Sequence, residues 1–110
     1  MIEIDYTREF KRNLRQLSRR YRRIRSDIEP VIEALKAGET LGDQVSGVGY
    51  TVFKVRVKNS DNNKGKSGGY RVVYYVKTET HITLVTMYSK SDQGDIEDDT
   101  LRRILQEYER

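Results

Sequence analysis

The sequence predicts a small α+β domain with a mainly antiparallel four-stranded sheet, two N-terminal helices and one C-terminal helix. Three observations lead to this prediction. Apolar residues recur at helical spacing through residues 7–37 and again after residue 98. Strand-like segments occupy residues 2–6, 53–58, 70–76 and 82–88. The 110 residues show no internal repeat, so we expect a single domain over residues 1–110.

The N-terminal third begins with a short strand, because Ile2, Ile4 and Tyr6 alternate with acidic residues. Thr7 then suits the N-cap of a helix. The apolar stripe of this helical region consists of Phe10, Leu14, Leu17, Tyr21, Ile24 and Ile28. A capping-box pattern at residues 26–29 predicts a second helix start, with Pro30 in its first turn. Residues 7–37 therefore form two helices, or one broken helix.

The remaining elements are three strands and a helix. Residues 38–49 are predicted to be a loop, because four glycines and polar residues fill them. A turn at residues 78–80 makes the strands around it an antiparallel hairpin. Asp98 and Asp99 favour the start of the last helix. Its buried residues are expected to be Leu101, Ile104, Leu105 and Tyr108.

One strand carries cations on a single face. Lys54, Arg56 and Lys58 alternate with apolar residues, and successive strand side chains point to opposite faces. Helices must cover one face of the sheet. We therefore expect the other face, or part of it, to stay open and to carry Lys54 and Arg56.

The composition narrows the possible functions. The chain has no cysteine and one histidine, which excludes disulfides, thiolate metal sites and multi-histidine metal sites. No apolar run approaches the roughly 20 residues of a membrane span, and the N-terminus lacks the features of a signal peptide. We therefore expect a soluble cytoplasmic protein that does not contact membranes.

The net charge of +4 is unevenly distributed. Residues 6–25 contain nine cations and one acid, and residues 53–77 contain seven cations and one acid. Such clusters indicate a polyanionic partner, either nucleic acid or an acidic protein, although a solvated helix face has the same pattern. The candidates for RNA binding are Lys58, Lys64, Lys66, Arg19, Arg20, Arg22 and Arg23.

The segment Gly65-Lys66-Ser67 looks like the end of a nucleotide phosphate loop, but its context differs. Such a loop needs a glycine five positions before Gly65, and that position is Ser60. It also needs a following helix, whose N-terminal N–H groups hold the phosphate. Here a strand-favouring segment follows. The segment is better interpreted as a glycine-rich hairpin turn that carries lysines.

The sequence lacks the residue patterns that metal-assisted catalysis and histidine–nucleophile catalysis require. A hard-cation site needs converging carboxylates, whereas the acids here lie mainly at helix ends and turns, away from the basic strand. His81 has no recognisable nucleophile beside it and is expected at an edge or on the surface. We therefore expect no metal ion and no cofactor.

A basic face that includes tyrosine suits RNA cleavage without metal. The 2′-OH of RNA attacks the adjacent phosphate, and the protein moves protons and stabilises the charge that develops on the phosphate. Arginine and lysine can stabilise the negative charge on the phosphate, and tyrosine can stack on a base or assist proton transfer. Arg71 lies inside an apolar strand, where an unpaired cation is costly, so it should face the same open surface or a partner.

The chain resembles the RelE/ParE superfamily of bacterial toxins, most closely its HigB-like and RelE-like branch. Three segments carry the resemblance: residues 53–57 (FKVRV), residues 64–75 (KGKSGGYRVVYY) and residues 87–93 (MYSKSDQ), followed by a C-terminal helix. The resemblance implies a small RelE-like fold and a ribosome-dependent endoribonuclease that cuts mRNA. Some members have an arginine directly after the lysine, where this chain has Ser91. Some members also carry a tyrosine early in the C-terminal segment, and in this chain Ile96 lies near that place.

The resemblance also implies site residues and partners. By motif, the expected catalytic set is Lys54, Arg56, Arg71 and Lys90, to which we add Tyr88 at the end of its strand. The expected partners are a cognate antitoxin, in a toxin–antitoxin hetero-oligomer, and mRNA on the ribosome. Two alternatives stay open: a ParE-like gyrase inhibitor that acts by protein–protein contact, and an RNA-binding module without catalysis.

Overall fold

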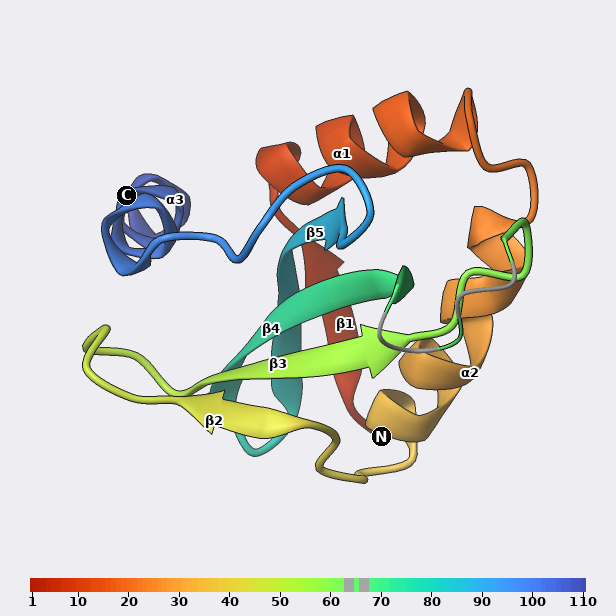
Figure 1. The fold of residues 1–110 in the computed structure, drawn as a ribbon. Coiled ribbons are helices and arrows are strands. Elements are labelled where there is room, and N and C mark those ends of the chain that lie inside the picture. Colours follow the sequence, from red (N-terminus) through yellow and green to blue (C-terminus); the bar gives the residue numbers. More distant parts are fainter. Residues whose placement is uncertain (63–64, 66–67) are drawn as a thin grey trace.

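The computed structural model describes residues 1–62, 65 and 68–110, and it has the expected α+β architecture (Figure 1). The elements follow in the order β1 (Glu3–Tyr6), α1 (Arg8–Ser18), α2 (Ile24–Lys36), β2 (Asp43–Val45), β3 (Val52–Val57), β4 (Tyr70–Thr78), β5 (His81–Ser89) and α3 (Asp98–Glu109). The sheet has the strand order β1-β5-β4-β3-β2. β1 pairs with β5 in parallel, and the other neighbours are antiparallel.

The sheet has five strands where the sequence predicts four. The additional strand, β2, lies within residues 38–49, which we expected to be loop. It spans only three residues, too few to show an alternating pattern, and it forms by pairing with Val52–Lys54 of β3. Gly42 precedes it with φ +78°, and a Cβ at Gly42 would lie 2.2 Å from the carbonyl oxygen of Lys54.

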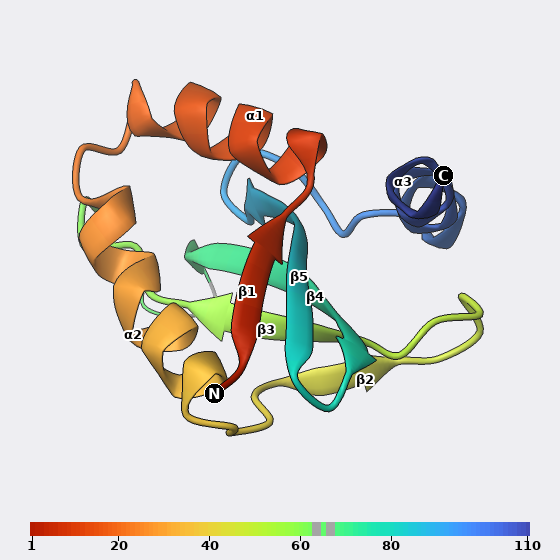
Figure 2. The same cartoon turned by 180° about the vertical axis from the view of Figure 1, so that it is seen from behind.

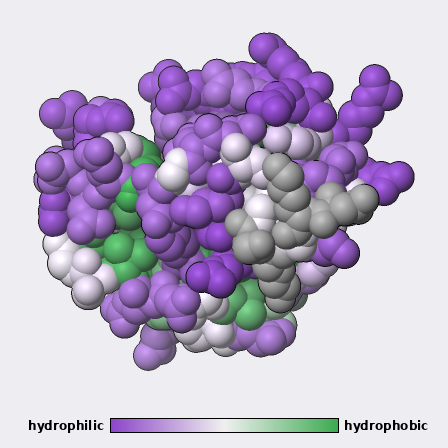
Figure 3. All heavy atoms as spheres, in the orientation of Figure 1, coloured by the Kyte–Doolittle hydropathy of each residue, from purple (hydrophilic) through white to green (hydrophobic). Residues whose placement is uncertain are grey.

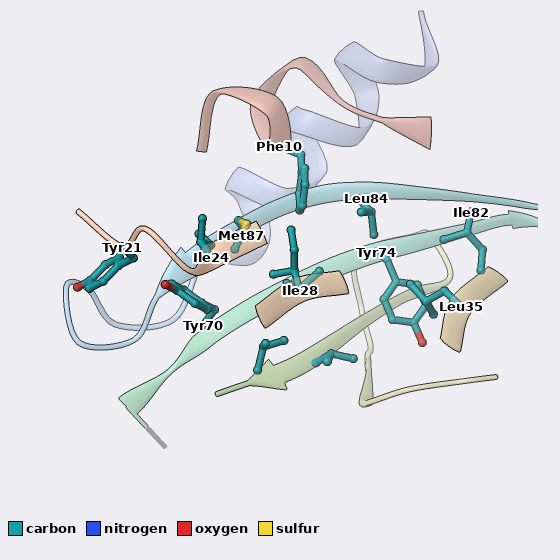
Figure 4. Close-up of a cluster of buried hydrophobic side chains, with 13 residues drawn as sticks. Phe10, Tyr21, Ile24, Ile28, Leu35, Tyr70, Tyr74, Ile82, Leu84 and Met87 are labelled. Carbon is teal, nitrogen blue, oxygen red and sulfur yellow. The ribbon is translucent and has the colours of Figure 1, made fainter. Parts of the chain in front are cut away.

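The helices cover both faces of the sheet, which corrects the expectation that they cover only one. α1 and α2 bury the larger core against Val55 and Val57 of β3 (Figure 4). α3 instead packs on Val52 of β3 and Val73 of β4. Because strand side chains alternate between faces, these two cores lie on opposite sides of the sheet. α3 also lies at the opposite side of the molecule from α2 (Figures 1 and 2).

The N-terminal helices begin differently. Thr7 caps α1 as predicted, because its Oγ1 accepts a hydrogen bond from the N–H of Phe10 at 2.9 Å. α2 begins at Ile24, ahead of the predicted start at residues 26–29, so Pro30 lies inside the helix. The carboxylate of Asp27 does not cap the helix and accepts a hydrogen bond from the N–H of Ser60 at 2.9 Å.

A bulge in β5 fixes α1 on the sheet. Val73 pairs with Thr86 and the next residue of β4 pairs with Leu84, so one extra residue, Val85, is inserted in β5. Thr7 donates a hydrogen bond to the carbonyl of Val85 at 2.6 Å. Asn13 of α1 accepts hydrogen bonds from the Thr86 hydroxyl and the next backbone N–H at 2.7 and 3.2 Å. These contacts hold the C-terminal half of β5, which carries Tyr88.

Candidate active site

Three side chains lie in a row across neighbouring strands: Arg56 of β3, Arg71 of β4 and Tyr88 of β5. Arg56 is directly opposite Arg71, and Arg71 is directly opposite Tyr88. Directly opposite residues of antiparallel strands point to the same face, with Cβ atoms about 4.5–5.5 Å apart. We call these three residues the basic row. The register alone therefore brings two guanidinium groups and a phenol together.

Two lysines flank the basic row. Lys54 precedes Arg56 by two residues and so lies on the same face of β3. Lys90 directly follows β5, and its N–H donates a hydrogen bond to the carbonyl of Gly69 at 2.8 Å. Both ammonium groups contact one carboxylate oxygen of Asp95, at 3.6 Å for Lys54 and 2.9 Å for Lys90. The five side chains proposed for catalysis thus lie close together, and their roles stay a prediction.

Asp95 is a member of this site that the sequence analysis missed. Its carboxylate contacts both lysines and accepts a hydrogen bond from the Tyr88 hydroxyl at 3.4 Å. The hydrogen bond from Lys90 and the charge of Lys54 hold the pKa of this carboxyl below its usual value. The expectation that the acids lie away from the basic strand is therefore wrong for Asp95. The family motif ends before it, and only the path of residues 91–97 brings it to Lys54.

Tyr88 is almost completely buried, with 4% of its surface exposed. Burial, opposed in part by a hydrogen bond with the backbone of Ile96, raises the pKa of its phenol above the ordinary value of 10. The phenol therefore stays protonated at neutral pH. A protonated hydroxyl on the residue opposite Arg71 is suited to donate a proton or a hydrogen bond to an anionic ligand.

Arg71 shares the face of Arg56, as the sequence predicts, but it is covered rather than open. Only 5% of its surface is exposed, and Nη1 donates a hydrogen bond to the carbonyl of Tyr70 at 3.2 Å. Its two strand neighbours on the same face are Arg56 and Tyr88. A charge with little exposure interacts more strongly with an anion than one surrounded by water.

The glycine turn positions this part of the sheet. A Cβ at Gly69 would lie 2.0 Å from the carbonyl oxygen of Val57, so the chain passes closer to the end of β3 than any other residue allows. Gly69 also accepts the hydrogen bond from the backbone of Lys90. The turn therefore acts as a structural device that fixes Arg71, two residues later. Lys64 and Lys66, predicted to bind RNA, lie outside the described residues.

The other predicted RNA-binding residues lie around the site. Lys58 follows β3 and is exposed. Arg19, Arg20, Arg22 and Arg23 are exposed in the connection between α1 and α2. Arg20 forms an ion pair with Asp92 at 2.9 Å, and Tyr21 donates a hydrogen bond to the same carboxylate at 3.4 Å. Because Asp92 belongs to the segment that carries Asp95, this segment links the arginine cluster to the basic row.

His81 lies at the start of β5, away from the basic row. Its ring contacts the carboxylate of Asp5, and Glu3 lies 3.7 Å from its Nδ1. Within the described part of the chain, no group of three His, Cys, Asp or Glu side chains is placed to hold a metal ion. The helices that the structure describes include none that is long and apolar enough to cross a membrane.

The fold and the basic row together define a class of small α+β domains that present cations and a tyrosine on a sheet face. A family model described as the RelE toxin of the RelE/RelB toxin–antitoxin system matches residues 7–108. The chain therefore belongs to this family, and it is a toxin of the RelE/ParE superfamily. Toxins of this family generally inhibit translation, and the family implies a RelB-type antitoxin as the partner.

Proposed function

We propose that the toxin is a ribosome-dependent mRNA endoribonuclease that cuts by attack of the RNA 2′-OH on the adjacent phosphate, without a metal ion. The observation that carries this proposal is the basic row, in which Arg56, Arg71 and Tyr88 meet through the strand register. The membership in the RelE family supports the same class of reaction. DNA lacks the attacking hydroxyl, so the substrate is RNA.

The charge on the phosphate would be stabilised by the cations of the site. During the attack the phosphate passes through a state with more negative charge than in the ground state, and fixed cations stabilise that state most. A hydrogen bond to the carbonyl of Tyr70 holds the Arg71 guanidinium in place, and the side chains around it would have to move for a phosphate to reach it. Lys54 and Lys90 flank it and share one counter-ion, Asp95.

Proton transfer requires an acid for the leaving 5′-oxygen and a base for the 2′-OH. Tyr88 suits the acid, because burial keeps its phenol protonated at neutral pH and it is next to Arg71. The two lysines are the candidates for the base. The outer cations, including Lys58 and the arginines of residues 19–23, would hold RNA phosphates of the message or the ribosome, in a salt-dependent manner.

The experiment is a cleavage assay with purified toxin, a defined mRNA and ribosomes that hold one codon in the decoding site, with the 5′ ends of the products mapped. We expect a cut in that codon only when ribosomes are present. Arg71→Ala should reduce the rate by at least about a hundredfold. The control is Lys36→Ala, which removes an exposed cation at the end of α2 and should cut like the wild type.

Two results would overturn the proposal. Intact mRNA beside an active positive-control toxin would exclude the nuclease, and an assay of gyrase supercoiling would then follow. Equal cleavage by Arg71→Ala and the wild type would exclude the basic row as the site. RNA binding without cleavage would indicate a binding module in place of an enzyme.

A further inference from the structure

The connection between β5 and α3 passes beside the basic row and is rich in acids. We call residues 91–97 the strap; it contains Asp92, Asp95 and Glu97 and no cation. It runs beside α1 on the face of the molecule seen in Figure 1, where hydrophilic side chains cover the surface (Figures 1 and 3). Two of its carboxylates contact cations of the proposed site, so the strap lies on the surface that RNA has to reach.

Asp95 lies where three donors converge. One oxygen of its carboxylate, Oδ1, is 2.9 Å from the ammonium of Lys90, 3.6 Å from that of Lys54 and 3.4 Å from the hydroxyl of Tyr88. Two ammonium groups and a protonated hydroxyl are also suitable partners for an RNA phosphate oxygen. The carboxylate of Asp95 therefore lies where we place the substrate phosphate.

Asp92 makes the same kind of contact with the arginine cluster. Its carboxylate is 2.9 Å from Nη1 of Arg20 and accepts a hydrogen bond from the Tyr21 hydroxyl at 3.4 Å. The guanidinium of Arg20 also lies 5.2 Å from the centre of the Tyr21 ring. Each of the two acids thus pairs with a tyrosine and with a cation that we propose to bind RNA.

The strap also covers Tyr88. The residue is 4% exposed, and its hydroxyl contacts both the carboxylate of Asp95 and the backbone of Ile96. Ile96 in turn packs against the core beneath α3, which holds this end of the strap. A buried hydroxyl that contacts the strap becomes accessible to a substrate oxygen only after the strap moves.

We propose that the strap is an autoinhibitory segment, in which the carboxylates of Asp92 and Asp95 occupy the positions of two RNA phosphates, and that it lifts when RNA binds. The assignment to RNA rests on the proposed function, whereas the movement of the strap can be measured without cleavage. The side chain of Asp95 is 59% exposed and that of Asp92 is 27% exposed. Ion pairs with such exposure are weak, so phosphates can replace them.

The strap gives its two acids an advantage over free RNA. A competing group on a short segment of the same chain acts at an effective concentration that is about millimolar. RNA in dilute solution has to displace this competitor, whereas a message held in the decoding site is presented at a high local concentration. The strap therefore supplies a physical reason why cleavage would depend on the ribosome.

The first test is hydrogen exchange of the wild-type toxin with and without a short 2′-O-methyl RNA, which offers phosphates but cannot be cut. The amides of Asp92 and Gln93 both donate to the carbonyl of Ser89, at 3.0 and 3.2 Å, and their exchange reports opening of the strap. We expect this exchange to become faster when the RNA binds. Slower or unchanged exchange in the strap, together with slower exchange around Arg71, would overturn the inference.

The second test compares two double variants by fluorescence anisotropy with the same RNA at low salt. Asp92→Asn/Asp95→Asn keeps the shape of both side chains and removes their charges, so it should bind the RNA at least about tenfold more tightly than the wild type. The control is Asp98→Asn/Asp99→Asn, which removes two charges at the start of α3, beyond the strap. It should bind within about twofold of the wild type, because these acids contact none of the site cations.

The outcomes separate the two proposals. Absent, unchanged or weaker binding by Asp92→Asn/Asp95→Asn would overturn the inference, because the acids would then hold the cations in place. An equal gain in both double variants would reduce the effect to net charge and would also overturn it. A strap that opens on RNA binding, in a toxin that never cuts RNA, would retain this inference and remove the proposed nuclease. Cleavage by a toxin whose strap stays closed would do the opposite.

Discussion

Arg56 and Arg71 lie directly opposite each other on neighbouring strands and point to the same face of the sheet. Like charges in this position destabilise a sheet, because their Cβ atoms are about 5 Å apart. Arg71 is also nearly buried, which makes its charge harder to screen. A like-charge pair that costs folding stability is typical of a site kept for function, such as a binding site for an anion.

The first prediction concerns this repulsion. Arg56→Gln removes one charge from an exposed position and should raise the free energy of unfolding by about 0.2–1 kcal/mol. The same variant should lower the rate of RNA cleavage. Urea unfolding measures the first effect and the ribosomal cleavage assay the second. A variant that is both less stable and fully active would contradict the account.

A second prediction concerns Asp95, whose carboxylate occupies the position between Lys54 and Lys90 where an RNA phosphate would bind. Asp95→Asn removes this competing anion, so binding of single-stranded RNA should become several-fold tighter at low salt. The gain should shrink as salt screens the charges. Fluorescence anisotropy with a short RNA measures it, and Asp98→Asn, at the start of α3, is the control. Weaker binding by Asp95→Asn would show that Asp95 positions the lysines.

Gly69 and Gly94 form a matched pair for a third prediction. Neither has a positive φ, but a Cβ at Gly69 would meet the carbonyl oxygen of Val57, whereas one at Gly94 would meet nothing within 4 Å. Gly69→Ala should therefore lower the free energy of unfolding by about 1–3 kcal/mol. Gly94→Ala should leave it unchanged or raise it slightly. Thermal unfolding of both variants tests this prediction. Equal melting temperatures would contradict the close approach of Gly69 to the carbonyl oxygen of Val57.

Two buried tyrosines of β4 give a fourth prediction. The Tyr74 hydroxyl donates to the carbonyl of Leu41 at 2.6 Å and accepts from its N–H at 2.9 Å. The Tyr70 hydroxyl is buried and has no hydrogen-bond partner among the described residues. Tyr74→Phe should therefore cost about 1–3 kcal/mol of stability, whereas Tyr70→Phe should be neutral or stabilising. Urea unfolding measures the stability of the two variants. A larger loss of stability in Tyr70→Phe than in Tyr74→Phe would contradict these contacts.

Local patterns in the sequence predicted most of the fold. The apolar stripe of residues 7–37, the Thr7 cap and the strand alternation each depend on neighbours within a few positions, and each element forms where its pattern lies. The start of α2 was misplaced, because a capping-box pattern competes with an earlier start at Ile24 that extends the same apolar stripe.

What the sequence could not predict depends on contacts between distant segments. β2 has too few residues for a pattern and exists only through its pairing with β3. The packing of α3 on Val52 and Val73 depends on the path of the chain after β5. For the same reason Asp95 was missed, since nothing local indicates that residues 91–97 cross to Lys54. Arg71, by contrast, was expected to face the open surface or a partner because an unpaired cation inside an apolar strand is costly, and the register places it on the face of Arg56.

The central claim is that the toxin uses the 2′-OH of its RNA substrate as the nucleophile. The most direct measurement is cleavage of an mRNA on the ribosome in which the single nucleotide 5′ of the mapped cut carries 2′-deoxyribose. The account predicts that cleavage disappears at that bond, while an unmodified mRNA in the same reaction is cut at the usual rate. Equal cleavage of both messages would contradict the account, because the attacking oxygen would then have to come from elsewhere.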